Sequence, residues 1–143
     1  MQNFAVLQSN YQYIPTDEDP QTIQKVFDEY DIDIDFTHRS GENNEIQVFT
    51  KLSINNSEKT LPGYSLFIEG AGIFFIDPNQ VSKKEEEINL KYYSTVSILL
   101  GYLRNSLSNM TASAPLGPYI LPPIDLSDLF MKKNEKAGNS DTK

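Results

Sequence analysis

The first half of the chain alternates between apolar and polar side chains with a period of two, as β-strands with one buried face do. The alternation is clearest in residues 31–36 and 45–54. Residues 4–14 and 64–76 are rich in β-branched and aromatic side chains and complete a set of four predicted strands. Turn-forming sequences such as SGENN and NNSEKTLPG separate successive strands. Four strands joined in succession by loops of modest length predict an antiparallel meander.

Two segments depart from this simple alternation. Residues 22–30 contain Phe27 and Tyr30, which need burial, and they form either a short helical turn or an ordered crossover. In the fourth strand, one face is apolar before Gly70-Ala71-Gly72, whereas both faces are apolar in the residues that follow. Two glycines at such a change predict a bulge or a bend that carries the strand under another element.

The spacing of apolar residues becomes that of a helix in the second half of the chain. We expect this helix to begin near Ser82, because Ser82 and Glu85 have the spacing of a capping box. Further along, apolar side chains recur every three or four residues in one long stripe of coiled-coil type. Ile98, Leu100 and Tyr102 widen the stripe beyond what a single sheet needs to cover it. We therefore expect the stripe to be an oligomer interface, and its residues are Tyr92, Val96, Leu99, Leu103, Leu107 and Met110.

The last part of the chain has strong signals for where helices stop and start. Residues 114–125 contain four prolines, which break the hydrogen-bond ladder of a helix. Asp125 is placed to cap a final short helix with the sequence LSDLFMKK. Residues 132–143 are polar apart from one alanine, so we expect a disordered tail. Residues 1–131 are predicted to form a single α+β domain, with a four-stranded antiparallel sheet, one long helix and one short helix.

Composition and charge narrow the range of functions. The 143 residues carry a formal net charge of −8, and residues 1–131 alone carry −10 because the tail is rich in lysine. Such an acidic body repels phosphate backbones, so we expect no nucleic-acid partner. The apolar runs are far shorter than the roughly 18 residues of a membrane-spanning helix, so no membrane insertion is expected. No signal peptide is visible and there is no cysteine, which fits a cytoplasmic protein without disulfides.

Residues 31–42, DIDIDFTHRSGE, have carboxylates at the positions that an EF-hand calcium loop requires. That loop also needs glycine at its sixth position, where this chain has Phe36. Ile32 and Ile34 favour extended backbone, and the residues that follow have the periodicity of a strand. We therefore interpret the aspartates as the solvent face of a strand, and no metal site is expected.

The sequence contains no recognisable catalytic constellation. His38 is the only histidine, and no cysteine or second histidine is present to join it as a ligand. We expect His38 at the surface or at a sheet edge. The glycines at 70 and 72 are not followed by a third glycine and a helix start, so they do not indicate a dinucleotide site. Neither enzymatic activity nor a cofactor is expected.

Aromatic and apolar residues are frequent in the irregular segments. Such side chains either pack their own loops onto the sheet or line an exposed groove for extended polypeptide, and the residues alone leave both alternatives open. The side chains concerned are Phe27, Tyr30, Tyr119, Ile120, Leu121, Leu126, Leu129 and Phe130.

Several short sequences, in the same order, resemble the bacterial export chaperone family SecB. They are QK followed by Phe27, IDID at 32–35, GIFFI at 72–76 and PYILPPIDLSDLFM at 118–131. The last is the most specific, since it resembles the proline-containing linker and the final helix of the family. Together these sequences extend over most of residues 4–131.

The resemblance implies a homo-oligomer, either a dimer formed by pairing of first strands or a dimer of dimers packed through the long helices. It implies a cytoplasmic holdase chaperone that binds unfolded or precursor polypeptides, with protein export as its setting. The client groove of the family lies between the crossover after the first strand, the second strand and the final helix. On this resemblance, the client-binding residues are Phe27, Tyr30, Ile34, Leu126, Leu129 and Phe130.

Two departures from the family pattern leave a second hypothesis open. The long helix has ILLGYLR at 98–104, where family members carry a proline. The family docks the translocation ATPase SecA through carboxylates on the outer sheet face, and the matching positions here are Asn10, Ile14 and Phe67. The SecA docking patch is therefore expected to be missing. The alternative function is that of an adaptor or assembly protein of the SecB fold whose grooves are closed by its own side chains.

Overall fold

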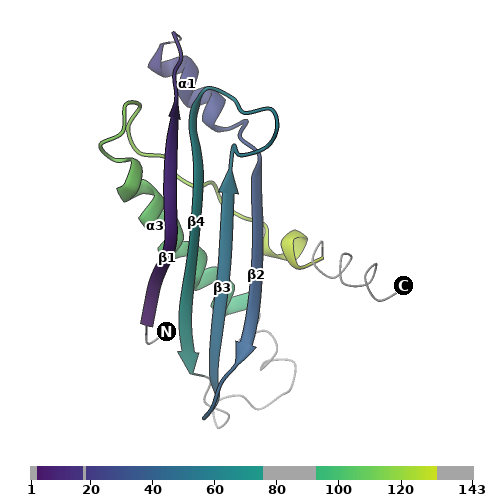
Figure 1. Cartoon of the computed structure of the whole chain (residues 1–143). Coiled ribbons are helices and arrows are strands. Elements are labelled where there is room, and N and C mark those ends of the chain that lie inside the picture. The colour runs from purple at the N-terminus through teal and green to yellow at the C-terminus, as the bar shows by residue number, and fades with distance from the viewer. Residues whose placement is uncertain (1–2, 18, 76–92, 132–143) are drawn as a thin grey trace.

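The computed structural model describes residues 3–17, 19–75 and 93–131, and these residues form a four-stranded antiparallel sheet with helices (Figure 1). The predicted α+β class is confirmed. The predicted capping box at Ser82 and the predicted tail lie outside the described residues. The elements are β1 (Asn3–Ile14), α1 (Pro20–Phe27), β2 (Ile32–Ser40), β3 (Glu45–Ile54), β4 (Gly63–Phe75) and α3 (Thr95–Thr111), followed by a short helix over residues 126–131.

The strand order β1-β4-β3-β2 differs in one respect from a simple meander. Strands β2, β3 and β4 follow one another through loops of modest length, as expected. The first strand instead pairs with the last, with Asn10 opposite Phe67, and the chain reaches β2 at the other edge through a crossover that contains α1. Figure 1 shows α1 at the end of the sheet where β1 ends. Local periodicity predicts strands but not which strand each one pairs with, and a crossover long enough to pass the sheet end permits this order.

Helix α3 packs on one face of the sheet, which we call the inner face (Figure 1). On this face β3 and β4 contribute a period-two series of buried side chains, among them Val48, Leu52, Leu66 and Ile68. The outer face carries the alternate residues, including the exposed Asp33 and Asp35 of β2. These aspartates therefore belong to a strand, as the interpretation of residues 31–42 requires.

The apolar stripe of α3 faces the chain's own sheet, and this corrects its assignment as an oligomer interface. Val96, Leu99, Leu103 and Leu107 are each 0% exposed in a single copy, because side chains spaced by three and four residues share one side of a helix. Met110 is partly buried against the same core, and Tyr92 lies outside the described residues. The apolar side chains of α3 that remain accessible point the other way: Ile98 is 42% exposed and Tyr102 is 45% exposed.

Among the described glycines, Gly70 is the one that a side chain of α3 approaches. A methyl group on Gly70 would lie 2.7 Å from Cδ2 of Leu103, so only glycine leaves room for this side chain. The bulge predicted near Gly70 occurs in the neighbouring strand instead. Strand β4 continues without a break, and the register of β1 shifts between Val6 and Gln8, opposite Gly70 and Glu69. The extra residue in β1 therefore accompanies the close helix contact.

The chain after α3 returns along the inner face and is held by side-chain hydrogen bonds. The Tyr64 hydroxyl donates to the Gly117 carbonyl and accepts from the Leu116 N–H, at 2.8 Å each. Residues 112–125 contain no helix, as the prolines predict. The Asp125 carboxylate accepts from the Asp128 N–H at 3.1 Å, which confirms the predicted cap of the short helix. None of the described helices is long and apolar enough to cross a membrane.

Candidate functional site

The six residues predicted to bind client polypeptide lie along the inner side of β2, and the aromatic ones among them lie at two places. Tyr30 is buried, and the other five side chains are partly buried and pack against the core. Phe27 and Tyr30 lie where the crossover meets β2, and Phe130 lies further along β2 on the short helix. Ile34 is on the inner face of β2 between these two places.

The first place is an aromatic cage, which we define as the rings of Tyr30, Tyr64 and Tyr119. Phe27, the last residue of α1, fills it. Its ring stacks on that of Tyr64 at a centroid distance of 5.5 Å and lies 5.4 Å from that of Tyr30. The Phe27 and Tyr119 rings are arranged edge-to-face, with their centroids 5.7 Å apart. Phe27 therefore contacts all three rings, and an aromatic side chain fits this space.

Hydrogen bonds fix Tyr30 in the cage wall. Its hydroxyl donates to the Pro62 carbonyl at 2.7 Å and accepts from the Tyr64 N–H at 2.9 Å. This hydroxyl lies where a side chain at Gly63 would be, and Gly63 has φ of 113°, a conformation that other residues rarely adopt. The buried Asn55 side chain donates to the Tyr64 carbonyl at 2.8 Å and thereby closes the β3–β4 loop. The loop between β3 and β4 is thus built around the Tyr30 hydroxyl.

The second place is an aromatic cluster around Phe130. The Phe130 ring lies 4.7 Å from that of Phe36 and stacks on that of Tyr93 at 4.4 Å. His38 presents its ring to Phe36 at 5.7 Å, and its Nε2 is 3.0 Å from the Thr95 hydroxyl. His38 is therefore on an edge strand, as expected, but it is half-buried rather than at the surface.

The two places are joined by a continuous apolar strip. Tyr119 stacks on Tyr30 at 6.0 Å and Phe130 contacts Phe36, so residues 119–130 follow β2 in the same direction. We call this strip the β2 seam, and it consists of Ile32, Ile34, Phe36, Leu126, Leu129 and Phe130. Phe36 is six residue steps beyond Tyr30, which corresponds to about 20 Å of extended chain. An extended peptide of about this length would reach from the cage to the Phe130 cluster.

Sequence reasoning missed part of this arrangement. Tyr64 and Phe36 were visible only as buried positions of alternating strands, which is the signal for a core residue. Tyr93 precedes α3 and has no periodic signal of its own. Tyr119 stood out as an aromatic residue between prolines, but its place in the cage depends on the return path of the chain after α3.

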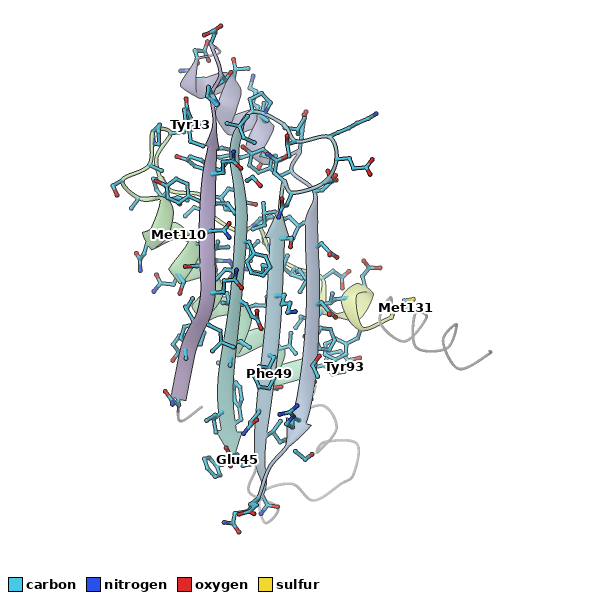
Figure 2. All side chains as sticks on the ribbon, in the orientation of Figure 1. Tyr13, Glu45, Phe49, Tyr93, Met110 and Met131 are labelled. Carbon is cyan, nitrogen blue, oxygen red and sulfur yellow. The ribbon has the colours of Figure 1, made fainter. Side chains whose placement is uncertain are left out.

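A pocket of about 440 Å³ lies at the other edge of the sheet, between β1 and the C-terminal half of α3. Figure 2 shows Met110 on the β1 side of the molecule and Tyr93 on the β2 side. The pocket therefore does not coincide with the predicted client residues. Its lining mixes polar and apolar side chains: Val6, Ser9, Ile68, Ser106, Asn109 and Met110. Within the described residues, no group of three or more His, Asp or Glu side chains is arranged to hold a metal ion.

The Tyr119 hydroxyl is in an unusual position for a polar group. The residue is 1% exposed, and its hydroxyl oxygen has no hydrogen-bond partner among the residues that the structure describes. Burial raises the pKa of this hydroxyl to about 12, and the nearby Tyr30 hydroxyl and Asp28 carboxylate act in the same direction. Burial also raises the pKa values of Tyr30 and Tyr64. A buried unpaired hydroxyl costs about 1–3 kcal/mol, so the fold tolerates a penalty at this point.

We expect the folded protein to lose stability in alkaline solution, and Tyr119 to contribute to this loss. A tyrosine in the unfolded chain ionises near pH 10, at about its ordinary pKa. The folded-state pKa of Tyr119 is about 12, so its contribution is fully present below pH 10 and disappears as the pH rises towards 12. Urea unfolding of the wild-type protein and of Tyr119→Phe across this pH range measures the effect. The variant should lose less stability, and identical pH profiles would contradict the assignment.

Residues 16–137 match the profile of the family described as SecB, preprotein translocase subunit SecB. The chain belongs to the SecB family. It shares 26% identity over 87 residues with the protein-export protein SecB of Anaplasma phagocytophilum (strain HZ), a match that spans 61% of this chain but only 55% of that protein. An uncharacterised protein of Methanocaldococcus jannaschii is 28% identical over 122 residues, which are 82% of this chain and 75% of that protein.

A solved structure shows the same SecB fold. The Rv1957 SecB-like chaperone of Mycobacterium tuberculosis, in complex with a ChAD peptide from the Rv1956 HigA1 antitoxin, superposes with a TM-score of 0.51. The match covers 87% of this chain and 88% of that chain at 16% identity. Membership of the SecB family supports a chaperone-type function for the chain.

The positions that matched the SecA-docking carboxylates of other SecB proteins lie together on this sheet. Asn10 and Phe67 are direct partners in the β1–β4 ladder, and Ile14 lies four residues along β1 on the same face as Asn10. None of these three side chains is acidic.

Proposed function

We propose that the protein is a cytoplasmic holdase chaperone that binds non-native or precursor polypeptides along the β2 seam and the neighbouring aromatic cage. The observation that supports this proposal most directly is the partial exposure of apolar and aromatic side chains along β2 in a member of the SecB family. Partly buried apolar strips of this kind bind extended chains by burying side chains of many sequences.

The backbone of β2 adds to this proposal. Among the described strands, β2 is at the edge of the sheet and β3 is its neighbour. Edge strands in general can pair their backbone with an added strand. Backbone pairing does not depend on client sequence, which suits a protein that binds many non-native chains. A role in protein export is part of the proposal, whereas coupling to SecA is not, because the matching positions lack carboxylates.

We also propose that the chain forms a homo-oligomer through surfaces other than the buried stripe of α3. Apolar side chains remain exposed on β1, at Leu7 and Tyr11, and on the outward side of α3, at Ile98 and Tyr102. Strand β1 is the second edge of the sheet, so it offers both backbone groups and apolar surface to another copy. A dimer through β1 would leave α3 accessible for a dimer of dimers.

The alternative function, that of an adaptor or assembly protein, also has an observation in its favour. Phe27 fills the aromatic cage, and Tyr30 and Tyr119 are buried. If the apolar surface near β2 is permanently closed by the chain's own side chains, the protein would bind one folded partner rather than many unfolded chains.

The test is suppression of aggregation of a chemically denatured client at a stoichiometric ratio, with sedimentation of the protein in the presence and absence of an unfolded peptide. We expect the wild-type protein to suppress aggregation and to sediment as an oligomer that carries the peptide. Phe130→Ser should weaken peptide binding by about tenfold, because it removes an aromatic contact of the seam. Phe75→Ser is the matched control, since Phe75 is 48% exposed but lies at the far end of β4 on the outer face.

Absence of suppression together with binding of a single folded partner would favour the adaptor function. Equal effects of the two serine variants would place client binding away from the β2 seam.

A further inference from the structure

The Phe27 ring occupies a site that has the chemistry of a binding site for an aromatic side chain. We propose that Phe27 is a displaceable plug: the aromatic cage accepts an aromatic side chain of an extended polypeptide when Phe27 leaves it. This inference rests on the proposed polypeptide-binding function and names the side-chain class that the cage selects. The main support for this inference is that the Phe27 ring of α1 contacts three tyrosine rings from other parts of the chain.

The construction of α1 permits Phe27 to leave without loss of the helix. Both ends of the helix are capped by neighbouring residues: the Asp19 carboxylate accepts from the Thr22 N–H at 2.8 Å, and the Asp28 N–H bonds to the Lys25 and Val26 carbonyls. The helix packs against the core through Val26 and Phe27 near its C-terminal end. A short helix with its own caps can move as a unit.

The cage wall, in contrast, stays in place when α1 moves. Tyr30 is bonded to Pro62 and Tyr64, and the Tyr64 hydroxyl is bonded to Leu116 and Gly117. The exposed residues Asp28 and Glu29 separate the plug from this anchor and are the only residues between Phe27 and Tyr30. Rotation at these two residues would withdraw Phe27 and break the hydrogen bonds from the Tyr30 N–H to the Phe27 carbonyl and from the Glu29 N–H to the Val26 carbonyl. The hydrogen bonds of the Tyr30 hydroxyl to Pro62 and Tyr64 would be kept.

The Tyr119 hydroxyl gives a reason why an incoming peptide would be favoured over Phe27. The Phe27 side chain supplies a ring but no oxygen or nitrogen that can accept a hydrogen bond from this buried hydroxyl, which has no partner among the described residues. A bound polypeptide supplies both an aromatic ring and backbone carbonyls. Pairing of the hydroxyl with such a carbonyl removes the penalty that the closed form carries.

The experiment measures binding of two fluorescently labelled unfolded peptides that differ only by a Phe→Ala change in an apolar stretch. For the wild-type protein, the peptide with phenylalanine should bind more tightly. Phe27→Ala should raise the affinity for this peptide by about fivefold, because the plug no longer competes for the cage. The same variant should leave the affinity for the alanine peptide nearly unchanged. Equal changes for both peptides, or weaker binding of the phenylalanine peptide, would overturn the proposal.

A second pair of variants keeps the test decisive if Phe27→Ala folds poorly. Tyr119→Phe keeps the ring but removes the hydroxyl, and it should weaken binding of the phenylalanine peptide by about fivefold. Thr50→Val is the matched control, because the Thr50 hydroxyl is also buried and unpartnered among the described residues but lies on β3 beneath α3. Thr50→Val should not change peptide affinity. Equal effects of the two variants would overturn the proposal.

The outcomes separate the inference from the proposed function. If the wild-type protein binds neither peptide, the polypeptide-binding function fails and the plug fails with it. If it binds both peptides with equal affinity and Phe27→Ala changes nothing, the polypeptide-binding function stands and only the plug is wrong.

Discussion

Replacement of Leu103 by alanine is expected to lower the free energy of unfolding by about 2–5 kcal/mol, the range for deletion of a large core side chain. Leu103 is 0% exposed, and its Cδ2 occupies the space that a side chain on Gly70 would need. Glycine has no side chain that can move into the cavity, and the strand backbone is held by pairing on both sides. The site therefore cannot collapse easily, and we expect a loss in the upper half of this range.

Urea unfolding followed by circular dichroism measures this loss, with Asn105→Ala as an exposed control on the same helix that should change stability by about 0.5 kcal/mol or less. The contact with Gly70 allows a sharper test by a double-mutant cycle. Gly70→Ala alone should destabilise, because its methyl group would lie 2.7 Å from the leucine. In the double variant that methyl group enters the vacated space, so the two losses should not add. Strict additivity would contradict the contact.

Much of the fold follows from local features of the sequence. The period of two predicts β2, β3 and β4, because one face of each of these strands is covered and the alternation continues through Ile54 and Ile68. Strand β1 is mostly exposed, and its β-branched and aromatic composition predicts it instead. The prolines after α3 and the cap at Asp125 locate the return segment and the short helix, since both signals act within a few residues.

The features of the fold that could not be predicted depend on contacts between residues that are far apart in the sequence. Nothing local indicates that β1 pairs with β4, and the bulge near Leu7 depends on that pairing. The stripe of α3 is apolar whether it faces a sheet or a second helix, so periodicity alone could not assign it to the core rather than to an oligomer. The resemblance to SecB correctly indicated the fold and the crossover, but the same residues Phe27 and Tyr30 proved to be partly or fully covered within one copy.

Hydrogen bonds link the crossover, the β3–β4 loop and the segment after α3 at the candidate site. The Tyr30 hydroxyl joins the crossover to the β3–β4 loop, and Tyr64 joins that loop to the segment after α3. Three segments that are far apart in the sequence therefore meet in the cage wall. A change that shifts Tyr30 should affect both the stability of the domain and the shape of the proposed binding surface.

Gly63→Ala should disturb the hydrogen-bonded cage wall around Tyr30 most strongly. We expect it to lower the free energy of unfolding by about 2–5 kcal/mol. The loss has two sources. The φ of 113° at Gly63 is strained for alanine, and the new methyl group would overlap the Tyr30 hydroxyl and press on the Phe27 ring. Urea unfolding at neutral pH measures the total loss.

Gly117→Ala separates the two sources of this loss. Gly117 has a φ of 81°, but apart from its two chain neighbours no atom of the described residues lies within 4 Å of the position that a methyl group would take. This variant should therefore cost only about 1–2 kcal/mol of backbone strain. A larger loss for Gly63→Ala than for Gly117→Ala, together with alkaline titration of Tyr30 closer to the ordinary tyrosine range, would show that the Tyr30 anchor has been displaced. Equal losses would mean that the hydroxyl moves aside freely and that the cage wall is not fixed by Gly63.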